Sequence, residues 1–215
     1  MTPQPFGRVR RCRGLRIVPC GGRGPQPKKK TLLYLASQSV RRREILRKMR
    51  IPFRVTGSAY RETFLPGLSP RRLALRHAVG KAKRAKAPAG VRWVLGADTL
   101  VVCRGRILGK PRTKKEAIGM LGLLSGHFNF VLTAVALLDL ETGKVRTGVS
   151  KTKVFIRPLS AKEKQEYVRR IDPYDKAGGY AIQEGPRIVR KIEGSRSNVV
   201  GFPAELVRKM LKQIK

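Results

Sequence analysis

One acidic residue stands where a carboxylate could do chemistry. The chain has 13 Asp and Glu among 215 residues, and Asp98 interrupts the apolar run 93–102. Burying a carboxylate is costly unless it holds a cation, takes part in chemistry or accepts hydrogen bonds. Hard carboxylate oxygens suit Mg²⁺ or Mn²⁺, which commonly bind one or two carboxylates together with substrate phosphates. We favour a metal-binding or general-base role for Asp98 over a strand-end carboxylate that accepts a backbone hydrogen bond.

A second group of residues could bind phosphate. A predicted strand ends near Ser37, a predicted helix begins near Ser39, and Arg41, Arg42 and Arg43 occupy the first turn of that helix. The N-terminus of a helix has unpaired N–H groups and partial positive charge, so three arginines there are unfavourable unless an anion is bound. Backbone amides, hydroxyls and guanidinium groups would form a phosphate cradle. The alternative is that three arginines mean little in so basic a chain.

Further candidates lie later in the chain. Residues 172–183 form a turn-rich segment whose glycines would let backbone approach a ligand closely. Gln183 ends this segment, and its amide could read the edge of a base. Lys81 and Lys110 could neutralise phosphate charge. His77 shares a predicted helix face with apolar residues, which favours a core or boundary position over catalysis.

The charge of the chain points to polyanions. Forty-nine Lys and Arg give a formal net charge of +36 and a pI near 11.6. Such a field attracts nucleic acid, anionic surfaces and phosphorylated small molecules. The basic residues are spread through every segment, so a compositional drift of solvated faces is favoured over a dedicated nucleic-acid surface, which stays open.

The remaining composition favours a soluble globular protein. Hydrophobic residues make up 41%, enough for a core. No run reaches the ~18 apolar residues that a membrane span needs. Three cysteines without a CxxC pair argue against a disulfide framework and a zinc site, and make a cytoplasmic location the default. Residues 1–30, which are acid-free and rich in Gly and Arg, are predicted to be a disordered basic arm before a domain at 31–215.

Strands and helices are predicted to alternate without a strict βαβ repeat, which indicates an α/β or α+β fold with a mixed sheet. Ser69 and Pro70 predict a helix start, and capping boxes are predicted at 113–116 and 160–163. The predicted strands are 31–36, 53–58, 93–102, 106–108, 130–139, 144–156 and 188–192, and the predicted helices begin at 40, 70, 113, 160 and 203.

Six blocks in order resemble the Maf family of nucleotide pyrophosphatases, also called septum-formation proteins. The resemblance spans roughly residues 32–211. The blocks are Leu35-Ala-Ser with Arg41-Arg42-x-Glu44, Leu95-Gly-Ala-Asp-Thr-Leu-Val101, Leu108-Gly-Lys-Pro111, Leu124-Ser-Gly126, Asp175-Lys-Ala-Gly178 with Ile182-Gln183, and Ile192-Glu-Gly-Ser195 with Asn198-Val-Val-Gly201. Each block is weak alone, but the ordered set is specific.

This resemblance implies an elongated α/β fold shared with inosine-triphosphate pyrophosphatases, in which helices flank a mixed sheet and two lobes enclose a cleft. It also implies a divalent metal (Mg²⁺ or Mn²⁺) and a homodimer. Asp98 matches the proton acceptor that activates water, and Glu62 matches a metal-linked acid. Lys81 and Lys110 match lysines of the phosphate site. The predicted catalytic residues are Asp98, Glu62 and Lys110, the predicted metal ligands are Glu62 and Asp98, and the predicted substrate-binding residues are Ser37, Ser39, Arg41, Arg42, Lys81, Thr99 and Gln183.

The same resemblance implies a reaction and a substrate. Water attacks the α-phosphorus of a nucleoside triphosphate, which yields the monophosphate and pyrophosphate. Arg42, Thr99 and Gln183 match the positions that separate subfamilies, and their identities resemble the branch that acts on dTTP and UTP. Two alternatives stay open: a pyrophosphatase for 7-methyl-GTP or modified nucleotides, and a basic nucleic-acid-binding or septation-linked protein that keeps the fold with little turnover.

Five positions depart from the family pattern. Asn129 stands where histidine is frequent, Val40 replaces the proline before the arginines, and Arg196 stands where an aromatic residue is common. Ala181 and Glu184 replace the glycines that flank the Ile-Gln pair. None removes a predicted catalytic acid, but Glu184 adds negative charge near a triphosphate pocket and puts the affinity or base preference in question.

Overall fold

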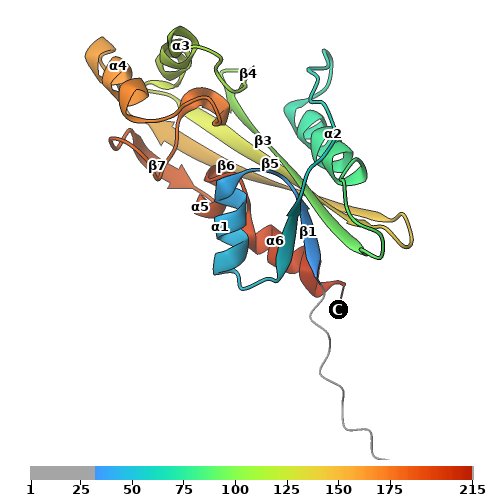
Figure 1. The fold of residues 1–215 in the computed structure, drawn as a ribbon. Coiled ribbons are helices and arrows are strands. Elements are labelled where there is room, and N and C mark those ends of the chain that lie inside the picture. Colours follow the sequence, from blue (N-terminus) through green and yellow to red (C-terminus); the bar gives the residue numbers. More distant parts are fainter. Residues whose placement is uncertain (1–31, 215) are drawn as a thin grey trace, which may run out of the picture. The chain divides into compact units, whose positions relative to one another are not determined.

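A computed structural model describes residues 32–214 as an α/β fold with one mixed seven-stranded sheet, which confirms the predicted fold class (Figure 1). The predicted N-terminal arm lies outside the described residues. The strand order is β2-β1-β3-β5-β6-β7, and β4 pairs with β3. The strands are β1 Leu33–Ala36, β2 Phe53–Thr56, β3 Trp93–Cys103, β4 Arg106–Leu108, β5 Phe128–Asp139, β6 Val145–Ile156 and β7 Val189–Glu193.

The helices begin close to their predicted starts, because caps and apolar periodicity define them. They are α1 Val40–Lys48, α2 Pro70–Lys83, α3 Lys114–Leu124, α4 Ala161–Arg170, α5 Arg196–Val199 and α6 Ala204–Lys212, with a 3₁₀ turn, η1, at Ala177–Gly179. Ser69 caps α2, and the capping box at Ser160 and Glu163 is complete. The predicted capping box at Thr113 is confirmed only in part. The side chain of Thr113 accepts a hydrogen bond from the N–H of Glu116, but the carboxylate of Glu116 accepts its bond from the N–H of Arg112 rather than from that of Thr113.

The central strand β3 has one fully paired edge and one interrupted edge. β5 pairs antiparallel with it from Trp93 to Cys103. On the other edge, β1 pairs in parallel with residues 93–95 and β4 pairs antiparallel with residues 101–103. Residues 96–100 therefore have no strand partner on that edge within the described part of the chain. The gap lies just beyond the carboxyl end of β1, the position where ligands bind in open α/β sheets.

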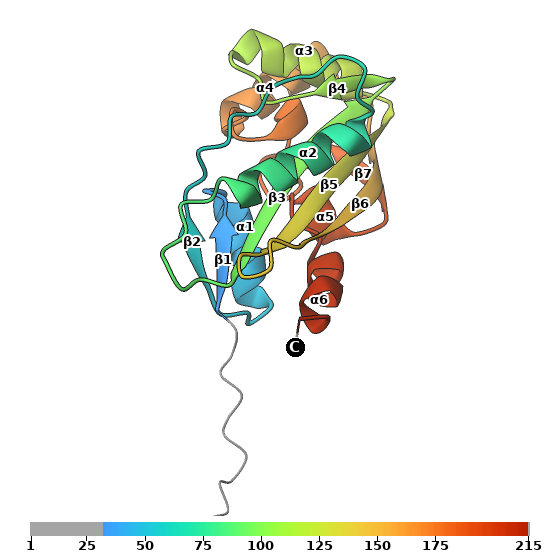
Figure 2. The same cartoon turned by 90° about the vertical axis from the view of Figure 1, so that its right-hand side faces the viewer.

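The two faces of the sheet are covered unequally. Alanines of α2 pack on one face, against Val94 of β3 and Ala134 and Ala136 of β5. The opposite face contributes Leu95 and Val135 to a core with α1 and α6. Farther along the same opposite face, α3 and α4 cover the ends of β3, β5 and β6. Figures 1 and 2 show α2 on one side of the sheet and the other long helices on the other.

These cores define two lobes of residues 32–214. One lobe contains β1, β2, α1 and α6, and the other contains β4, β7, α3 and α4 (Figure 1). The strands β3, β5 and β6 run through both. The cleft between the lobes, implied by the family resemblance, lies at the interrupted edge of β3.

Helix α2 lies unusually close to β3 because of Gly96. A Cβ atom at this position would lie 2.3 Å from the carbonyl oxygen of Ala78 and 2.8 Å from the backbone nitrogen of Ala82. Both are backbone atoms of the helix, so a side chain could be accommodated only by moving α2. The close approach brings Lys81 of α2 to Asp98 of β3.

We predict that Gly96→Ala destabilises the fold by about 1–3 kcal/mol, the usual cost of overpacking a well-packed core. The control is Gly119→Ala in α3, where an added Cβ meets nothing within 4 Å. It should be neutral or stabilising by at most about 1 kcal/mol, because alanine favours helix over glycine. Urea unfolding of both variants measures the difference, and equal midpoints would contradict the close-packing argument.

Candidate active site

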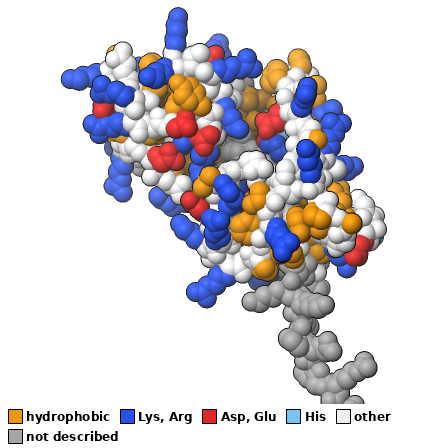
Figure 3. All heavy atoms as spheres, in the orientation of Figure 1, with side chains coloured by type: hydrophobic (Ala, Val, Ile, Leu, Met, Phe, Trp, Pro, Cys, Tyr) orange, Lys and Arg blue, Asp and Glu red, His pale blue; other side chains and the backbone are white. Residues whose placement is uncertain are grey.

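A cleft of about 460 Å³ opens at the interrupted edge of β3 and is lined by residues of both lobes. All ten predicted site residues line it: Ser37, Ser39, Arg41, Arg42, Glu62, Lys81, Asp98, Thr99, Lys110 and Gln183. They come from α1, α2, β3 and the four loops that follow β1, β2, β4 and η1. In Figure 3, basic side chains are scattered over this side of the molecule, whereas several acidic ones lie beside a hollow.

A lysine bridges the two predicted catalytic acids. The Nζ atom of Lys81 lies 2.6 Å from Oδ1 of Asp98 and 2.6 Å from Oε1 of Glu62. Asp98 is buried at 3% exposure, whereas Glu62 is on the loop between β2 and α2 with about half of its side chain exposed. A buried carboxylate needs such a partner, since an unpaired charge in the interior is strongly unfavourable. The three groups form one charged cluster at the cleft wall.

The electrostatics favour an ionised Glu62. Burial raises the pKa of its carboxyl, but the charge and hydrogen bond of Lys81 and the charge of Lys110 outweigh burial. The pKa of Glu62 therefore lies below its usual value. The carboxylate is present throughout the neutral range, ready to attract a cation.

The acids fit a divalent metal that also contacts substrate. Oδ2 of Asp98 is buried and has no hydrogen-bond partner among the described residues. Within residues 32–214 no cluster of three or more His, Cys, Asp or Glu could enclose an ion. Two carboxylates completed by phosphate oxygens and water are the usual environment of Mg²⁺, so Glu62 and Asp98 suit such an ion.

Arg42 holds the interrupted edge of β3 in place. Its Nη1 donates to the carbonyl of Ala97 at 2.7 Å and to Oγ of Ser37 at 3.1 Å. Its Nε donates to the carbonyl of Gly201, and its Nη2 donates to Oγ1 of Thr99. The guanidinium thus supplies donors where a neighbouring strand is missing, and burial lowers its pKa. Arg42 also lines the cleft, next to Ser37 and Thr99.

Arg41 points across the cleft to the other lobe. Its Nη1 lies 2.6 Å from Oδ2 of Asp175, and its Nη2 donates to the carbonyl of the same residue. Burial raises the pKa of Asp175, but hydrogen bonds from Lys176 and Arg41 outweigh burial, so the net pKa is lowered. This pair links α1 with the loop 172–183, and it places a guanidinium beside the cleft.

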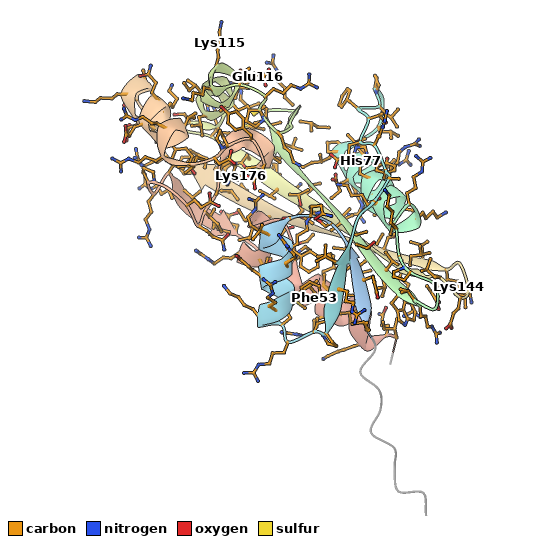
Figure 4. The ribbon with its side chains drawn as sticks, in the orientation of Figure 1. Phe53, His77, Lys115, Glu116, Lys144 and Lys176 are labelled. Atoms are coloured by element: carbon orange, nitrogen blue, oxygen red, sulfur yellow. The ribbon has the colours of Figure 1, made fainter. Side chains whose placement is uncertain are left out.

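Sequence reasoning missed Lys176 as a site residue. Its side chain is 5% exposed, and its Nζ lies 2.8 Å from Asp175 and 3.0 Å from Glu184 (Figure 4). Glu184, the departure that adds negative charge, therefore has a buried positive partner. The Asp175-Lys-Ala-Gly178 block was the available signal for Lys176, but periodicity could not tell which side chain of that loop points inward.

The first turn of α1 has donors available for an anion. Ser39 is the N-cap, and its side chain makes no capping bond within the described residues. Ser39 lines the cleft together with Ser37 and Val40. Helix N-termini of this kind bind phosphate. Lys110 and Gln183 lie on the opposite wall, where both side chains are exposed.

Two buried residues support the cleft walls from behind. Oδ1 of Asn129 accepts a 2.9 Å hydrogen bond from the hydroxyl of Tyr180, which lines the cleft, and burial raises the pKa of this tyrosine. His77 is 3% exposed, and its Nδ1 lies 2.9 Å from the hydroxyl of Tyr60. The prediction of a core or boundary position for His77 is confirmed.

The fold and the cleft therefore define an α/β protein with a phosphate-suited, acid-containing cleft between two lobes. Residues 32–214 match the family described as Maf-like protein, and the chain belongs to this family. It is 40% identical to the dTTP/UTP pyrophosphatase of Hydrogenovibrio crunogenus over 187 residues, which cover 86% of this chain and 96% of the relative.

Other relatives agree in name and extent. The chain is 42% identical to the dTTP/UTP pyrophosphatase of Geobacter sulfurreducens over 183 residues, covering 85% of this chain and 96% of the relative. It is 39% identical to the protein of the same name in Methanosarcina barkeri over 183 residues, covering 84% and 93%. Among the described residues, no helix is long and apolar enough to cross a membrane.

We predict that Lys81→Met raises the pKa of Glu62, because the variant loses the positive charge and hydrogen bond that lower it. A lowered pKa stabilises the fold above the unfolded pKa, and that contribution is lost as pH falls through the folded pKa. In the variant this contribution shrinks, so acid unfolding should begin at higher pH. Carboxyl NMR titration and acid unfolding measure both effects, with Lys115→Met, on the outer side of α3, as control (Figure 4). An unchanged Glu62 titration would contradict the prediction.

We predict that Asp175→Asn tightens the binding of inorganic pyrophosphate by several-fold at most, because an exposed ion pair contributes about 0.2–1 kcal/mol. The variant leaves Arg41 free to meet the anion. Asp172→Asn removes a neighbouring charge that has no ion pair with Arg41 and serves as the matched control. Titration calorimetry distinguishes the variants, and weaker binding by Asp175→Asn would refute competition between Asp175 and the ligand.

Proposed function

We propose that this protein hydrolyses dTTP and UTP to the monophosphate and pyrophosphate. The observation that carries the proposal is the buried Asp98 at the cleft, held on one oxygen by Lys81 and without a hydrogen-bond partner on the other among the described residues. Two considerations support it: the ten predicted residues converge on one cleft, and relatives about 40% identical over most of their length are named dTTP/UTP pyrophosphatases.

The triphosphate is bound by cationic groups and amide donors on both walls of the cleft. The N–H groups at the start of α1 and the hydroxyls of Ser37 and Ser39 bind phosphate oxygens from one lobe. Arg41 from that lobe and Lys110 from the other add positive charge. Held at several points, the substrate loses the freedom that a bimolecular reaction would otherwise have to restrict.

Asp98 then accepts the proton of the attacking water. Its Oδ1 is fixed by Lys81, so Oδ2 is the oxygen free to orient and deprotonate water. The oxygen of that water bonds to the α-phosphorus, and the bond from this phosphorus to the bridging oxygen breaks. The electron pair of that bond leaves with pyrophosphate, and the proton stays on Asp98 until solvent removes it.

Glu62 and Asp98 would hold Mg²⁺ or Mn²⁺ at this point. The ion, when bound, supplies positive charge to the phosphate oxygens as negative charge develops. Glu62 suits this task because Lys81 and Lys110 keep its pKa low and its carboxylate ionised. Glu62 lies on the loop between β2 and α2 with about half of its side chain exposed, whereas Asp98 is buried on β3.

Gln183 is the side chain best placed to read the base. Gln183 lines the cleft and is exposed, and its amide both donates and accepts, as the edge of uracil or thymine requires. The hydroxyl of Thr99 already interacts with Arg42, Thr133 and Gly201, so it shapes the site from behind. The homodimer implied by the family resemblance and the cytoplasmic location indicated by the cysteine content are kept as predictions.

We predict metal-dependent release of pyrophosphate from dTTP and UTP that falls by about 100-fold or more in Asp98→Asn, the usual loss for a general base. The matched control is Asp139→Asn. Asp139 is another buried strand aspartate paired with a basic residue, Arg92, but it is outside the cleft. The assay uses dTTP, UTP, CTP, ATP, GTP and 7-methyl-GTP with Mg²⁺ or Mn²⁺.

The outcomes separate the hypotheses. Turnover of 7-methyl-GTP alone would assign the chain to another branch of the family but would not contradict the proposed role of Asp98. Equal losses in Asp98→Asn and Asp139→Asn would mean that the variants act through stability rather than chemistry. Absence of turnover with every nucleotide by the folded wild-type chain would overturn the enzymatic proposal.

A further inference from the structure

One end of the sheet has aromatic and basic side chains on the same face. β-Register places Phe128 opposite Phe155 and Phe130 opposite Lys153 across β5 and β6. Lys191 of β7 pairs with Phe155 in the same way. Side chains two residues apart on a strand share a face, which adds Lys151. We call Phe128, Phe130, Lys151, Lys153, Phe155 and Lys191 the aromatic–basic face.

This face is turned away from α3 and α4. The alternating neighbours Asn129, Val131, Thr152, Val154 and Ile156 are buried at 0–1% exposure on the opposite side. In contrast, Phe128 is 40% exposed, Lys191 is largely exposed, and Lys153 is partly exposed. Figure 2 shows α2 as the helix on this side of the sheet, with β6 and β7 beside it.

The rings contact positive charge as well as each other. The Nζ atom of Lys151 lies 4.0 Å from the centre of the Phe130 ring, and that of Lys153 lies 4.0 Å from the centre of the Phe128 ring. Phe128 and Phe155 contact each other with ring centres 4.8 Å apart. Glu193 is the acid beside this group, and it already pairs with Lys153 and Lys191.

We propose that the aromatic–basic face binds single-stranded nucleic acid. Sheet surfaces that stack unpaired bases on aromatic rings and bind the backbone through basic side chains are a recurrent solution for this ligand. The six side chains provide both elements on adjacent strands. A chain of net charge +36 adds long-range attraction for such a polyanion.

The existing lysine–ring contacts are compatible with this ligand. Base–aromatic stacking is stronger than an exposed cation–π contact, so a base displaces the ammonium group from the ring. The flexible stems of Lys151 and Lys153 then let each ammonium reach a phosphate next to the stacked base. Without nucleic acid, the same ammonium groups cover the rings and keep them hydrated.

A second copy of this chain is a poorer occupant. A symmetric dimer through this face would bring Lys151, Lys153 and Lys191 toward the same three lysines, with Glu193 as the opposing charge already engaged. Double-stranded nucleic acid is also disfavoured, because its bases are stacked on each other and present no free face to Phe128 or Phe130.

None of the six side chains lines the nucleotide cleft. Binding at the aromatic–basic face and hydrolysis in the cleft are thus separable, and the two proposals fail independently. The N-terminal residues 1–31 are also basic, so the test compares variants of the full chain in which that segment is unchanged.

The test measures the fluorescence anisotropy of labelled oligothymidylate and oligouridylate, with an abasic oligomer of equal length as the probe without bases. Phe128→Ala and Phe130→Ala should each weaken binding of the base-containing oligomers about tenfold or more and leave abasic binding unchanged. Lys151→Gln with Lys153→Gln should reduce the slope of log affinity against log salt by roughly 0.7 for each lysine removed.

Matched controls come from other surfaces. Lys114→Gln with Lys115→Gln removes the same charge from exposed positions on α3, and Tyr174→Ala removes an exposed ring from the loop after α4. Neither should alter binding of the base-containing oligomers. Hydrolysis of dTTP should be equal to wild type in all aromatic–basic face variants.

Three results would overturn the proposal. Abasic and base-containing oligomers binding equally well would show that bases are not stacked. Equal losses in the Lys114 and Lys115 control would show diffuse charge rather than a site. A dimer in sedimentation that Phe128→Ala dissociates would assign the face to a second copy. If Phe130→Ala does not fold, Phe128→Ala gives the same comparison at an exposed ring.

Discussion

The contact between Lys81 and Asp98 is the constraint on which the site depends. A carboxylate buried at 3% exposure on the central strand needs a cation, and that cation must come from the helix that covers it. The helix reaches the strand because Gly96 has no side chain to keep it away. The same lysine holds Glu62, which fixes the loop between β2 and α2 against the cleft. Gly96 thus sets the distance between α2 and β3, and Lys81 then links both predicted catalytic acids.

The cleft itself follows from backbone hydrogen bonding. β1 ends after pairing with residues 93–95 of β3, and β4 begins to pair only at residue 101. The backbone between them needs other partners, because buried N–H and C=O groups are rarely left unpaired. Arg42 donates to the carbonyl of Ala97, and a bound ligand has access to what remains. The edge of β3 that has no neighbouring strand is therefore available for ligand binding, and the buried Arg42 satisfies part of its backbone hydrogen bonding.

Much of this was predictable from sequence because it rests on local pattern. Alternating and periodic apolar residues predicted the seven strands and five longer helices, and a carboxylate within an apolar run predicted the importance of Asp98. α5 and η1 were missed because they span four and three residues, too few for a period to appear. The pair of Arg41 and Asp175 joins positions 134 residues apart, which no local pattern indicates.

The aromatic–basic face could not be predicted either, because its residues alternate as in any strand. Only the topology shows that α3 and α4 cover the opposite side of the sheet. The branch assignment and the catalytic roles came from the ordered family blocks, which periodicity alone would not have supplied.

In a chain this basic, the acidic residues locate the chemistry. Lysines and arginines are spread over the surface, so their presence at any one place discriminates little. The scarce acids are mostly held in ion pairs, and four of them, Glu62, Asp98, Asp175 and Glu184, line the cleft or pair with lysines that line it. They form two clusters, each organised around one lysine. Lys81 pairs with Glu62 and Asp98 on one wall, and Lys176 pairs with Asp175 and Glu184 on the other. The positive field of the whole chain attracts anions at long range, but salt at about 0.1 M screens this field beyond about 10 Å. The acid–lysine clusters act at contact distance, where screening is weak, and so set the local charges that a bound anion meets in the cleft.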